Sequence, residues 1–161
     1  MPNHVRNVLK FKHLKEKDIE FIINTIGTPL PRPSGDLTVF HDYLIDFDKI
    51  IPEPKTEAEC PDRYKMNKDS RAAELKDRPW FNWYDWHIDN WGTKWEAYDG
   101  YTKVGKSYVI FVFSTAWSMP YPIIERLRLL GYDFEHKYAD EDLGSNCGIL
   151  EYESERRVHT L

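Results

Sequence analysis

The alternation of hydrophobic and polar residues predicts that the chain opens with a strand and a helix. Across residues 4–12, the apolar side chains of Val5, Leu9 and Phe11 share one face, and the other face is mostly polar. Residues 14–26 then repeat their apolar positions every three or four residues, the spacing of an amphipathic helix. The glycine that follows supplies a stop for this helix.

Further strands and one more helix follow from the same pattern. A proline-rich stretch at 28–36 predicts a loop, and residues 37–47 predict a second strand after it. Residues 108–113 form a continuous apolar run, typical of a strand covered on both faces. The elements predicted after that run are a helix at 120–130, a strand at 132–138 and a last strand at 149–153.

The middle of the chain predicts an insertion between these elements. Residues 52–69 are polar and contain three prolines, so we expect an extended surface segment there. Residues 70–91 predict a helix that is broken or kinked at Pro79, with Gly92 as its end.

Two strand–helix–strand units, separated by this insertion and followed by one additional strand, indicate a ferredoxin-like split βαβ fold. The expected class is α+β, with one antiparallel sheet, helices on one face and a Trp-rich helical insertion. The length of 161 residues fits a single domain over residues 1–153, with the insertion at about 53–95 and a C-terminal tail at 154–161. Two cysteines, Cys60 and Cys147, are too few for an iron–sulfur cluster.

Five of the six tryptophans lie between residues 80 and 95, so the insertion is unusually aromatic. On a helical wheel, one face collects residues that we expect to pack on the sheet: Trp80, Tyr84, His87, Ile88 and Trp91. Trp83 and Trp86 fall beside this stripe, and the pattern leaves open whether they belong to the core or to a surface. Trp95, beyond Gly92, is expected in the next strand.

Aromatic rings beside cations and carboxylates suit a nucleotide, because a base stacks on any π-face and a cation meets its phosphate. Here Lys94 and Lys103 would meet a phosphate, and an aspartate would meet a hydroxyl. The same residue types dominate protein–protein hot spots, so a protein partner stays open. The candidate ligand- or partner-binding residues are Trp83, Trp86, Asp85, Asp89, Lys94, Trp95, Asp99 and Trp117.

Charge and hydropathy narrow the classes of partner. Twenty-two Lys and Arg against 27 Asp and Glu give a net charge of −5, which argues against nucleic acid and against an anionic membrane surface. No run of 18 apolar residues predicts a membrane-spanning helix. The N-terminus lacks the pattern of a signal peptide and the cysteines form no CxxC pair, so we expect a cytoplasmic protein.

Motifs of catalysis and metal binding are missing from the sequence. The six histidines form no HxH or HExxH pair, and the carboxylates of residues 140–142 fall in one turn, where solvation is the usual role. GxSxG, P-loop and GxGxxG motifs are not found. We therefore expect no metal, no cofactor and no assigned catalytic residue.

Several short motifs together resemble a known family. They are Met1–Val5 with Asn7, Phe47-Asp48 before Ile50-Ile51-Pro52, Trp83–Trp86, Asn90–Trp95 with Ala97–Asp99, Thr115–Ser118 with Pro120 and Pro122, and Tyr138–Glu141 with Gly144. This pattern is similar to the YubB-like proteins of phages and conjugative plasmids, and it covers residues 1 to about 153. The resemblance implies a ferredoxin-like domain and an accessory protein of a mobile element in a bacterial cytoplasm. It implies no reaction and no catalytic residue.

Three hypotheses on function follow. The favoured one is a non-enzymatic binder that counters host defence, either by sequestering a nucleotide-type signal or by blocking a defence protein. The alternatives are an enzyme that processes nucleotides or nucleic acid with carboxylates such as Asp85, Asp99, Asp140 and Asp142, and a nucleic-acid-associated accessory protein. A homo-oligomer, joined through the insertion or a sheet edge, is compatible with each.

Overall fold

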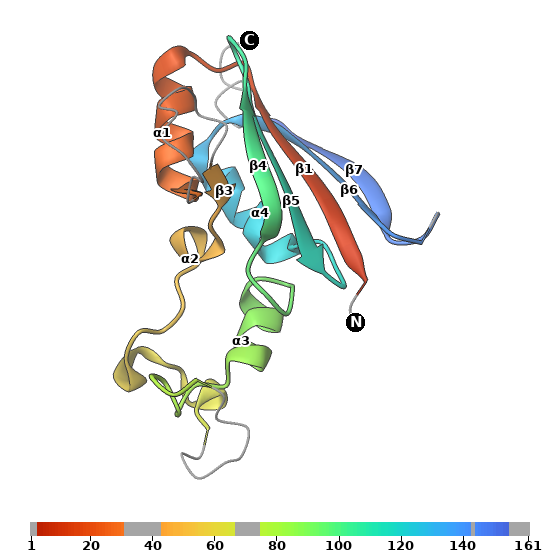
Figure 1. Cartoon of the computed structure of the whole chain (residues 1–161). Coiled ribbons are helices and arrows are strands. Elements are labelled where there is room, and N and C mark those ends of the chain that lie inside the picture. The colour runs from red at the N-terminus through yellow and green to blue at the C-terminus, as the bar shows by residue number, and fades with distance from the viewer. Residues whose placement is uncertain (1–2, 31–42, 67–74, 143, 155–161) are drawn as a thin grey trace.

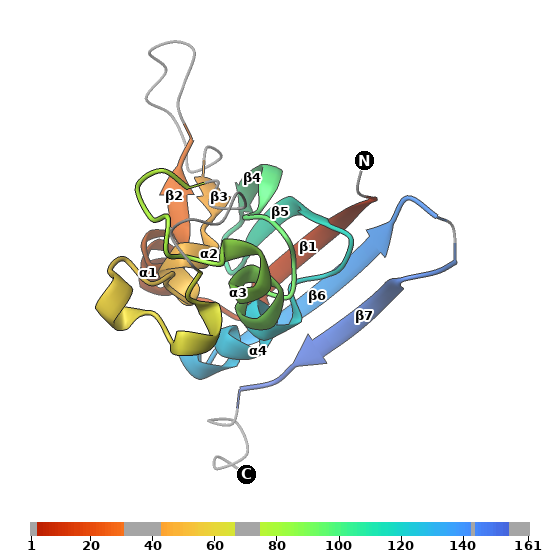
Figure 2. The same cartoon turned by 90° about the horizontal axis from the view of Figure 1, so that it is seen from below.

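The main feature of the fold is an antiparallel sheet with helices on one side (Figures 1 and 2). The computed structural model describes residues 3–30, 43–66, 75–142 and 144–154. Among these residues, five strands pair in the order β4-β5-β1-β6-β7. They are β1 (His4–Lys12), β4 (Tyr98–Val104), β5 (Val109–Ala116), β6 (Asp133–Asp140) and β7 (Cys147–Tyr152).

The connections are those of a ferredoxin-like fold, as the sequence predicts. Helix α1 (Glu16–Ile26) follows β1, and helix α4 (Tyr121–Leu127), extended by η3 (Arg128–Leu130), joins β5 to β6. Strand β5 lies between β1 and β4, so each βαβ unit is split by a strand of the other. Strand β7 adds an edge beside β6. Figure 2 shows α1 and α4 on the same side of the sheet.

The second strand predicted at 37–47 is confirmed over residues 43–45 in its described part, but it lies outside the main sheet. Residues 43–45 form β3 (Tyr43–Ile45), which pairs with β2 (Gly27–Pro29) outside the main sheet. Asp46 then starts helix α2 (Phe47–Ile50), because its side chain accepts hydrogen bonds from the Asp48 and Lys49 amides. Strand β4, after the insertion, takes the place expected for 37–47. Residues 31–42 lie outside the described residues.

The predicted helix at 70–91 is also shorter than expected. In its described part, an α-helix occupies only α3 (Trp83–Asn90), which Asn82 caps by accepting from the Asp85 amide. Residues 67–74 lie outside the described residues, and 75–82 form turns around Pro79. Gly92 ends α3 as predicted, with a left-handed φ of 78°. The preceding surface segment contains two short 3₁₀ turns, η1 (Glu57–Glu59) and η2 (Asp62–Tyr64).

The side of α3 that is buried differs from the prediction. Trp86 is 5% exposed and packs edge-on against Phe81 and Trp91, so it belongs to the core. Tyr84 and Ile88, expected in the core, are 48% and 41% exposed. The buried face therefore runs through residues 83, 86, 87, 90 and 91, which also have helical spacing. Aromatic residues occur on both sides of this helix, so hydrophobicity did not distinguish the two faces.

We expect Trp86→Ala to lower the free energy of unfolding by about 3–5 kcal/mol, because it leaves a cavity in the aromatic core of the insertion. Trp117→Ala is the matched control, since Trp117 is 57% exposed and should change stability by about 0.5 kcal/mol or less. Urea unfolding monitored by circular dichroism measures both. Equal effects of the two changes would contradict this assignment of the core.

Candidate functional site: the open face of the sheet

The side of the sheet opposite α1 and α4 carries a regular array of polar and aromatic side chains, here called the open face. On β1, Val5, Leu9 and Phe11 are fully buried toward the helices, so the even-numbered residues point the other way. The strand registers align three rows across this face. From β4 to β7 they are Tyr98-Ser114-Arg6-Ala139-Cys147, Tyr101-Val112-Val8-Lys137-Ile149 and Lys103-Ile110-Lys10-Glu135-Glu151.

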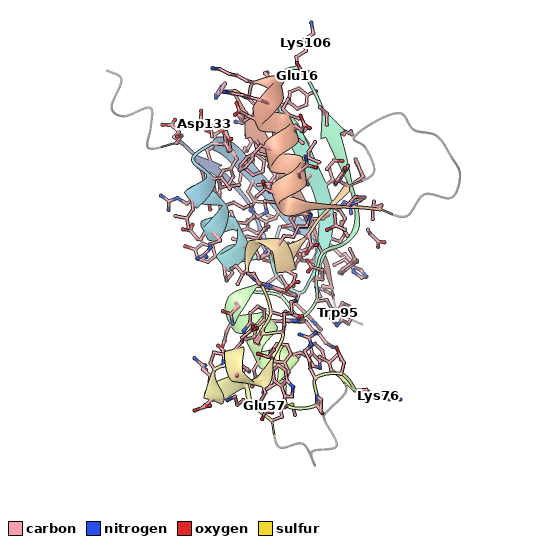
Figure 3. All side chains as sticks on the ribbon, turned by 90° about the vertical axis from the view of Figure 1, so that its left-hand side faces the viewer. Glu16, Glu57, Lys76, Trp95, Lys106 and Asp133 are labelled. Carbon is pink, nitrogen blue, oxygen red and sulfur yellow. The ribbon has the colours of Figure 1, made fainter. Side chains whose placement is uncertain are left out.

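Aromatic rings with cations above them line the β4 side of the open face. Trp95 contacts Tyr98 edge-on at 6.2 Å between ring centroids, and Tyr101 lies further along β4. The Lys94 ammonium lies 4.9 Å from the Trp95 ring centroid, and the Lys103 ammonium 5.7 Å from that of Tyr101. We call these three rings the aromatic strip. Figure 3 shows that Trp95 lies at the narrow waist between the sheet and the part of the insertion that carries Glu57 and Lys76.

Arg6 is held at the centre of this arrangement. Its Nη1 donates to the Ser114 hydroxyl at 2.9 Å and to the Asp99 carbonyl at 2.5 Å, and its guanidinium lies 5.9 Å from the Tyr101 ring centroid. The register between β4 and β5 shifts between Tyr98 and Tyr101, and Asp99 has a left-handed φ of 48°. This bulge turns the Asp99 carbonyl toward Arg6, which fixes a cation beside the strip.

Glycine at position 100 allows this bulge to lie close to its neighbours. A Cβ atom there would come within 2.5 Å of both the Val112 carbonyl oxygen and the Leu44 side chain. Any other residue would push β4 away from β5, so Gly100 is required for the geometry of the strip.

One end of the open face joins three side chains that are distant in the sequence. The Tyr98 hydroxyl and His4 Nδ1 are hydrogen-bonded at 2.5 Å, and the other imidazole nitrogen faces Glu141 at 4.0 Å. Burial raises the pKa of Tyr98 above its ordinary value, and the Asp99 and Glu141 carboxylates add to this. Tyr98 therefore stays protonated and can donate its hydrogen to His4.

The charge of the open face is divided between its two sides. On the β6–β7 side, Lys12 and Lys137 pair with Glu135 at 3.4 and 3.3 Å. On the β4–β5–β1 side, Arg6, Lys10 and Lys103 have no carboxylate within ion-pair distance among the residues that the structure describes. The side that holds the aromatic strip thus carries three cations without a paired carboxylate, and the Asp99 and Glu141 carboxylates lie at its Tyr98 end.

The buried side chain of Glu96 connects the strip to α2. Its carboxylate accepts from the Phe47 amide at 2.7 Å, from its neighbour Ala97 at 3.2 Å and from Asp48 at 3.3 Å. Burial raises the pKa of Glu96 to about 7, against the lowering effect of these backbone hydrogen bonds. The residue next to Trp95 is therefore a carboxyl group that titrates near neutral pH.

A second buried network fixes the insertion beneath Lys94. Glu53 hydrogen-bonds Nε2 of His87 and the Arg78 guanidinium, the latter at 2.9 Å, and His87 Nδ1 donates to the Lys94 carbonyl at 2.7 Å. Burial raises the pKa of Glu53, but the hydrogen bonds from His87 and Arg78 outweigh it and leave that pKa below its ordinary value. Trp91 stacks on His87 at 4.1 Å between ring centroids.

Comparison with known proteins supports the fold. Residues 90–161 match the family model described as a ferredoxin-like domain in Api92-like protein. The chain contains a ferredoxin-like domain. The matched part begins at the last residue of α3 and includes β4, β5, α4, β6 and β7, so it covers the strip and most of the sheet. No curated protein and no solved structure matches the chain.

The structure brings together only some of the residues singled out from the sequence. Lys94, Trp95, Asp99 and Lys103 lie on or beside the aromatic strip. Trp83 is half-buried and packs against the core, and Trp86 is in the core, so neither belongs to this face. Trp117 is exposed in the loop after β5, with a left-handed φ of 71°.

Five residues of the open face are not among the candidates from the sequence: His4, Arg6, Lys10, Tyr98 and Tyr101. The alternation in residues 4–12 already placed Arg6 and Lys10 on the polar face of the first strand. Their partners on β4 were not predictable, because the sequence assigned the neighbouring strand to residues 37–47.

Asp85 and Asp89 lie away from the strip, on the outer side of α3. They line a cavity of about 270 Å³ together with Arg63, Tyr84 and Ile88. The Tyr64 hydroxyl donates to Asp89 at 2.7 Å and Arg63 pairs with the same carboxylate at 3.1 Å. These carboxylates therefore form a separate surface.

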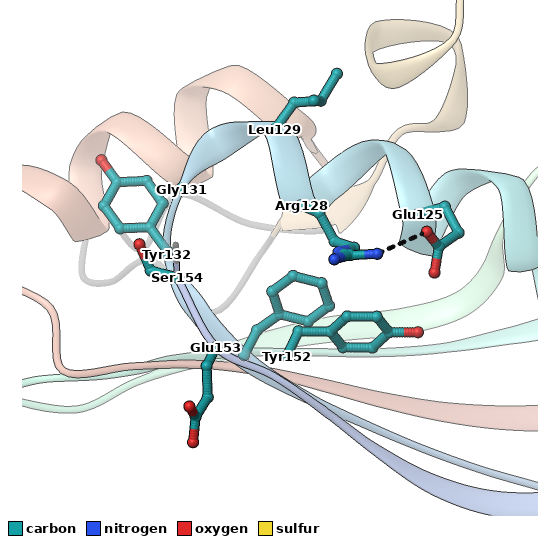
Figure 4. A pocket seen from close by; sticks show the side chains of 9 residues that line it. Glu125, Arg128, Leu129, Gly131, Tyr132, Tyr152, Glu153 and Ser154 are labelled. Carbon is teal, nitrogen blue, oxygen red and sulfur yellow. Dashed lines mark hydrogen bonds and ion pairs between the residues drawn. The ribbon is translucent and has the colours of Figure 1, made fainter. Parts of the chain in front are cut away.

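A larger cavity of about 420 Å³ lies on the helix side of the sheet, between η3 and the end of β7 (Figure 4). Tyr152 stacks on Phe134 at its floor, with 4.4 Å between ring centroids. Arg128 lies over Tyr152 and pairs with Glu125 at 3.2 Å, so the guanidinium is already engaged inside the cavity.

Within 3–30, 43–66, 75–142 and 144–154, no group of three or more His, Cys, Asp or Glu side chains is placed to hold a metal ion. In the same ranges no helix has both the length and the apolar character needed to cross a membrane.

The Glu96 carboxyl predicts a pH-dependent stability. Its folded pKa of about 7 exceeds the ordinary 4.5, so the folded chain holds this proton more tightly than the unfolded chain. The stabilisation is present below about pH 4.5 and is lost as the pH rises to about 7. Relative to Glu96→Gln, the wild-type chain should lose up to about 1.4 kcal/mol of unfolding free energy per pH unit in this window.

Urea unfolding of both chains across this pH range measures the difference. Burial lowers the pKa of His136 to about 4, so its contribution to the free energy of unfolding increases as the pH rises. Both chains contain His136, so this contribution cancels in the difference between them. A difference between the two chains that is constant with pH would show that Glu96 does not titrate as described.

Proposed function

We propose that the open face binds a nucleotide unit, meaning an aromatic base joined to a phosphate. The observation that carries the proposal is the aromatic strip with cations fixed beside it: Arg6, Lys94 and Lys103 each lie within 6 Å of a Trp95 or Tyr101 ring centroid. Base–aromatic stacking contributes about 1–3 kcal/mol per base, and a guanidinium is the favoured partner of a phosphate.

Local charge supports this ligand despite the acidity of the chain. The expectation against nucleic acid used the net charge of −5, which averages over the whole molecule. Arg6, Lys10 and Lys103 place three cations on the β4–β5–β1 side of the open face, away from the Asp99 and Glu141 carboxylates at its Tyr98 end. An anionic ligand responds to this local potential more strongly than to distant acids that salt screens.

The nucleotide unit has two sources, a free nucleotide-type signal and a single-stranded nucleic acid. Both present a base for the strip and a phosphate for Arg6. The resemblance to YubB-like proteins of phages and plasmids gives this ligand a biological setting. In that setting, the chain acts in the bacterial cytoplasm as an accessory protein of a mobile element and counters host defence by holding the ligand.

A second candidate function is the blocking of a host defence protein through α3. The observation in its favour is the exposure of Tyr84 and Ile88, one helical turn apart, at the rim of the cavity that Asp85 and Asp89 line. An exposed aromatic and an aliphatic side chain on one helix are typical of an interface anchor.

The proposal predicts that Tyr101→Ala and Lys103→Ala each weaken ligand binding. For Tyr101→Ala, which removes one stacking ring, the dissociation constant should rise by about 5- to 150-fold. Fluorescence anisotropy with labelled single-stranded RNA and DNA tests one source. Thermal shift with mononucleotides, cyclic oligonucleotides and NAD tests the other. Tyr84→Ala on α3 is the matched control, because it removes another exposed tyrosine and should leave affinity unchanged.

Salt dependence separates the two sources further. A strand that contacts several of these cations should lose affinity steeply as salt rises, whereas a single nucleotide should show a shallow slope. No binding to any of these probes, or equal loss in Tyr84→Ala and Tyr101→Ala, would contradict the proposal. Capture of a host protein that Tyr84→Ala abolishes would favour the second candidate.

A further inference from the structure

Three side chains at the end of the open face have the arrangement of a proton relay. The Tyr98 hydroxyl and His4 Nδ1 are hydrogen-bonded at 2.5 Å, and His4 Nε2 lies 4.0 Å from a Glu141 carboxylate oxygen. In the tautomer that carries its hydrogen on Nε2, His4 accepts from Tyr98. The His4 and Glu141 side chains are 45% and 57% exposed, so a ligand on this face can reach the group. A hydroxyl hydrogen-bonded to a base, with a carboxylate close to that base, can pass the proton of a substrate hydroxyl to the base.

The relay lies next to a fixed cation. His4 and Arg6 are two residues apart on β1 and therefore share the open face, and Arg6 is bound to Ser114 and to the Asp99 carbonyl. The bulge at Asp99 separates Tyr98 from Tyr101, so Tyr98 faces His4 while Tyr101 faces Arg6. Trp95 borders Tyr98 on its other side, where an unpaired base would stack.

We infer that this Tyr98–His4–Glu141 group cleaves single-stranded RNA at a ribose whose 2′-hydroxyl meets Tyr98. The inference rests on the proposed function, because the same face must first bind the strand. RNA is the substrate class because its 2′-hydroxyl is a nucleophile adjacent to the phosphate, and a relay that removes a proton needs such a hydroxyl to act on.

The step is a transesterification. The 2′-hydroxyl proton passes to the Tyr98 oxygen while the Tyr98 proton passes to His4 Nδ1, and Glu141 stabilises the resulting imidazolium. The 2′-oxygen forms a bond to phosphorus, and the bond from phosphorus to the 5′-oxygen breaks. The leaving 5′-oxygen takes a proton from water, and His4 later returns its proton to solvent. The products are a 2′,3′-cyclic phosphate and a 5′-hydroxyl.

Arg6 has the complementary role of binding the phosphate. Its guanidinium is already fixed by two protein acceptors, so it can meet the negative charge that develops on the phosphoryl oxygens without reorganising. No step uses a group other than these side chains, the strand and water.

The test uses the full chain with a 5′-labelled single-stranded RNA in the presence of EDTA, with products resolved by gel and by mass. We expect cleavage to a cyclic phosphate, and a loss of at least about 100-fold in rate for Tyr98→Phe and His4→Gln. Binding of an RNA that carries 2′-O-methyl groups should be kept in both variants. Tyr121→Phe is the matched control, because it removes a hydroxyl from an exposed tyrosine of α4, on the opposite side of the sheet, and should keep the rate.

Each outcome has a distinct meaning. Binding without cleavage overturns this inference and leaves the proposed function standing. Cleavage that survives in identically purified Tyr98→Phe and His4→Gln also overturns it, since the activity then lies elsewhere. Failure to bind RNA or any nucleotide overturns both the inference and the proposed function.

Discussion

Strand β1 is hydrogen-bonded along both edges, to β5 and to β6, and this double pairing is the constraint on which the rest of the structure depends. Because side chains alternate along a strand, the pairing places Val5, Leu9 and Phe11 against the helices and Arg6 and Lys10 on the open face. A slip of one residue would exchange the two sets and bury the cations. The hydrophobic core thus fixes the position of the charges that the proposed ligand needs.

The insertion positions the other end of the aromatic strip. The partly buried Glu53 and Arg78 and the buried His87 hold α3, and His87 binds the Lys94 carbonyl directly. Glu96 then binds the start of α2, so the residues on both sides of Trp95 are tied to the fold. A Trp ring held in this way stacks on a base with little loss of conformational entropy. The insertion therefore fixes the position of Trp95 beside the open face. The exposed side of α3 is accessible to another molecule.

Elements whose hydrophobic residues recur at a regular spacing were predictable from the sequence. The pairing of the strands and the packing of the helix faces were not. Strand β1, helix α1 and helix α4 follow from alternation, helical spacing and the glycines that end the helices. The strand predicted at 37–47 forms β3 outside the main sheet in its described part, and the predicted buried side of α3 was wrong. Several segments are hydrophobic enough for either role. The contact between His4 and Tyr98 joins residues 94 positions apart and depends on a bulge, which no local pattern indicates.

The central claim is that the open face is the ligand surface, and amide NMR of an isotope-labelled chain titrated with a short single-stranded RNA tests it most directly. The account predicts that the shifted signals come from β4, β5 and β1, concentrated around Arg6, Tyr98 and Tyr101. The signals of α3 and of the cavity beside Tyr152 should stay in place. Shifts confined to α3 or to that cavity would contradict the account, because the ligand would then bind a surface that the aromatic strip does not form.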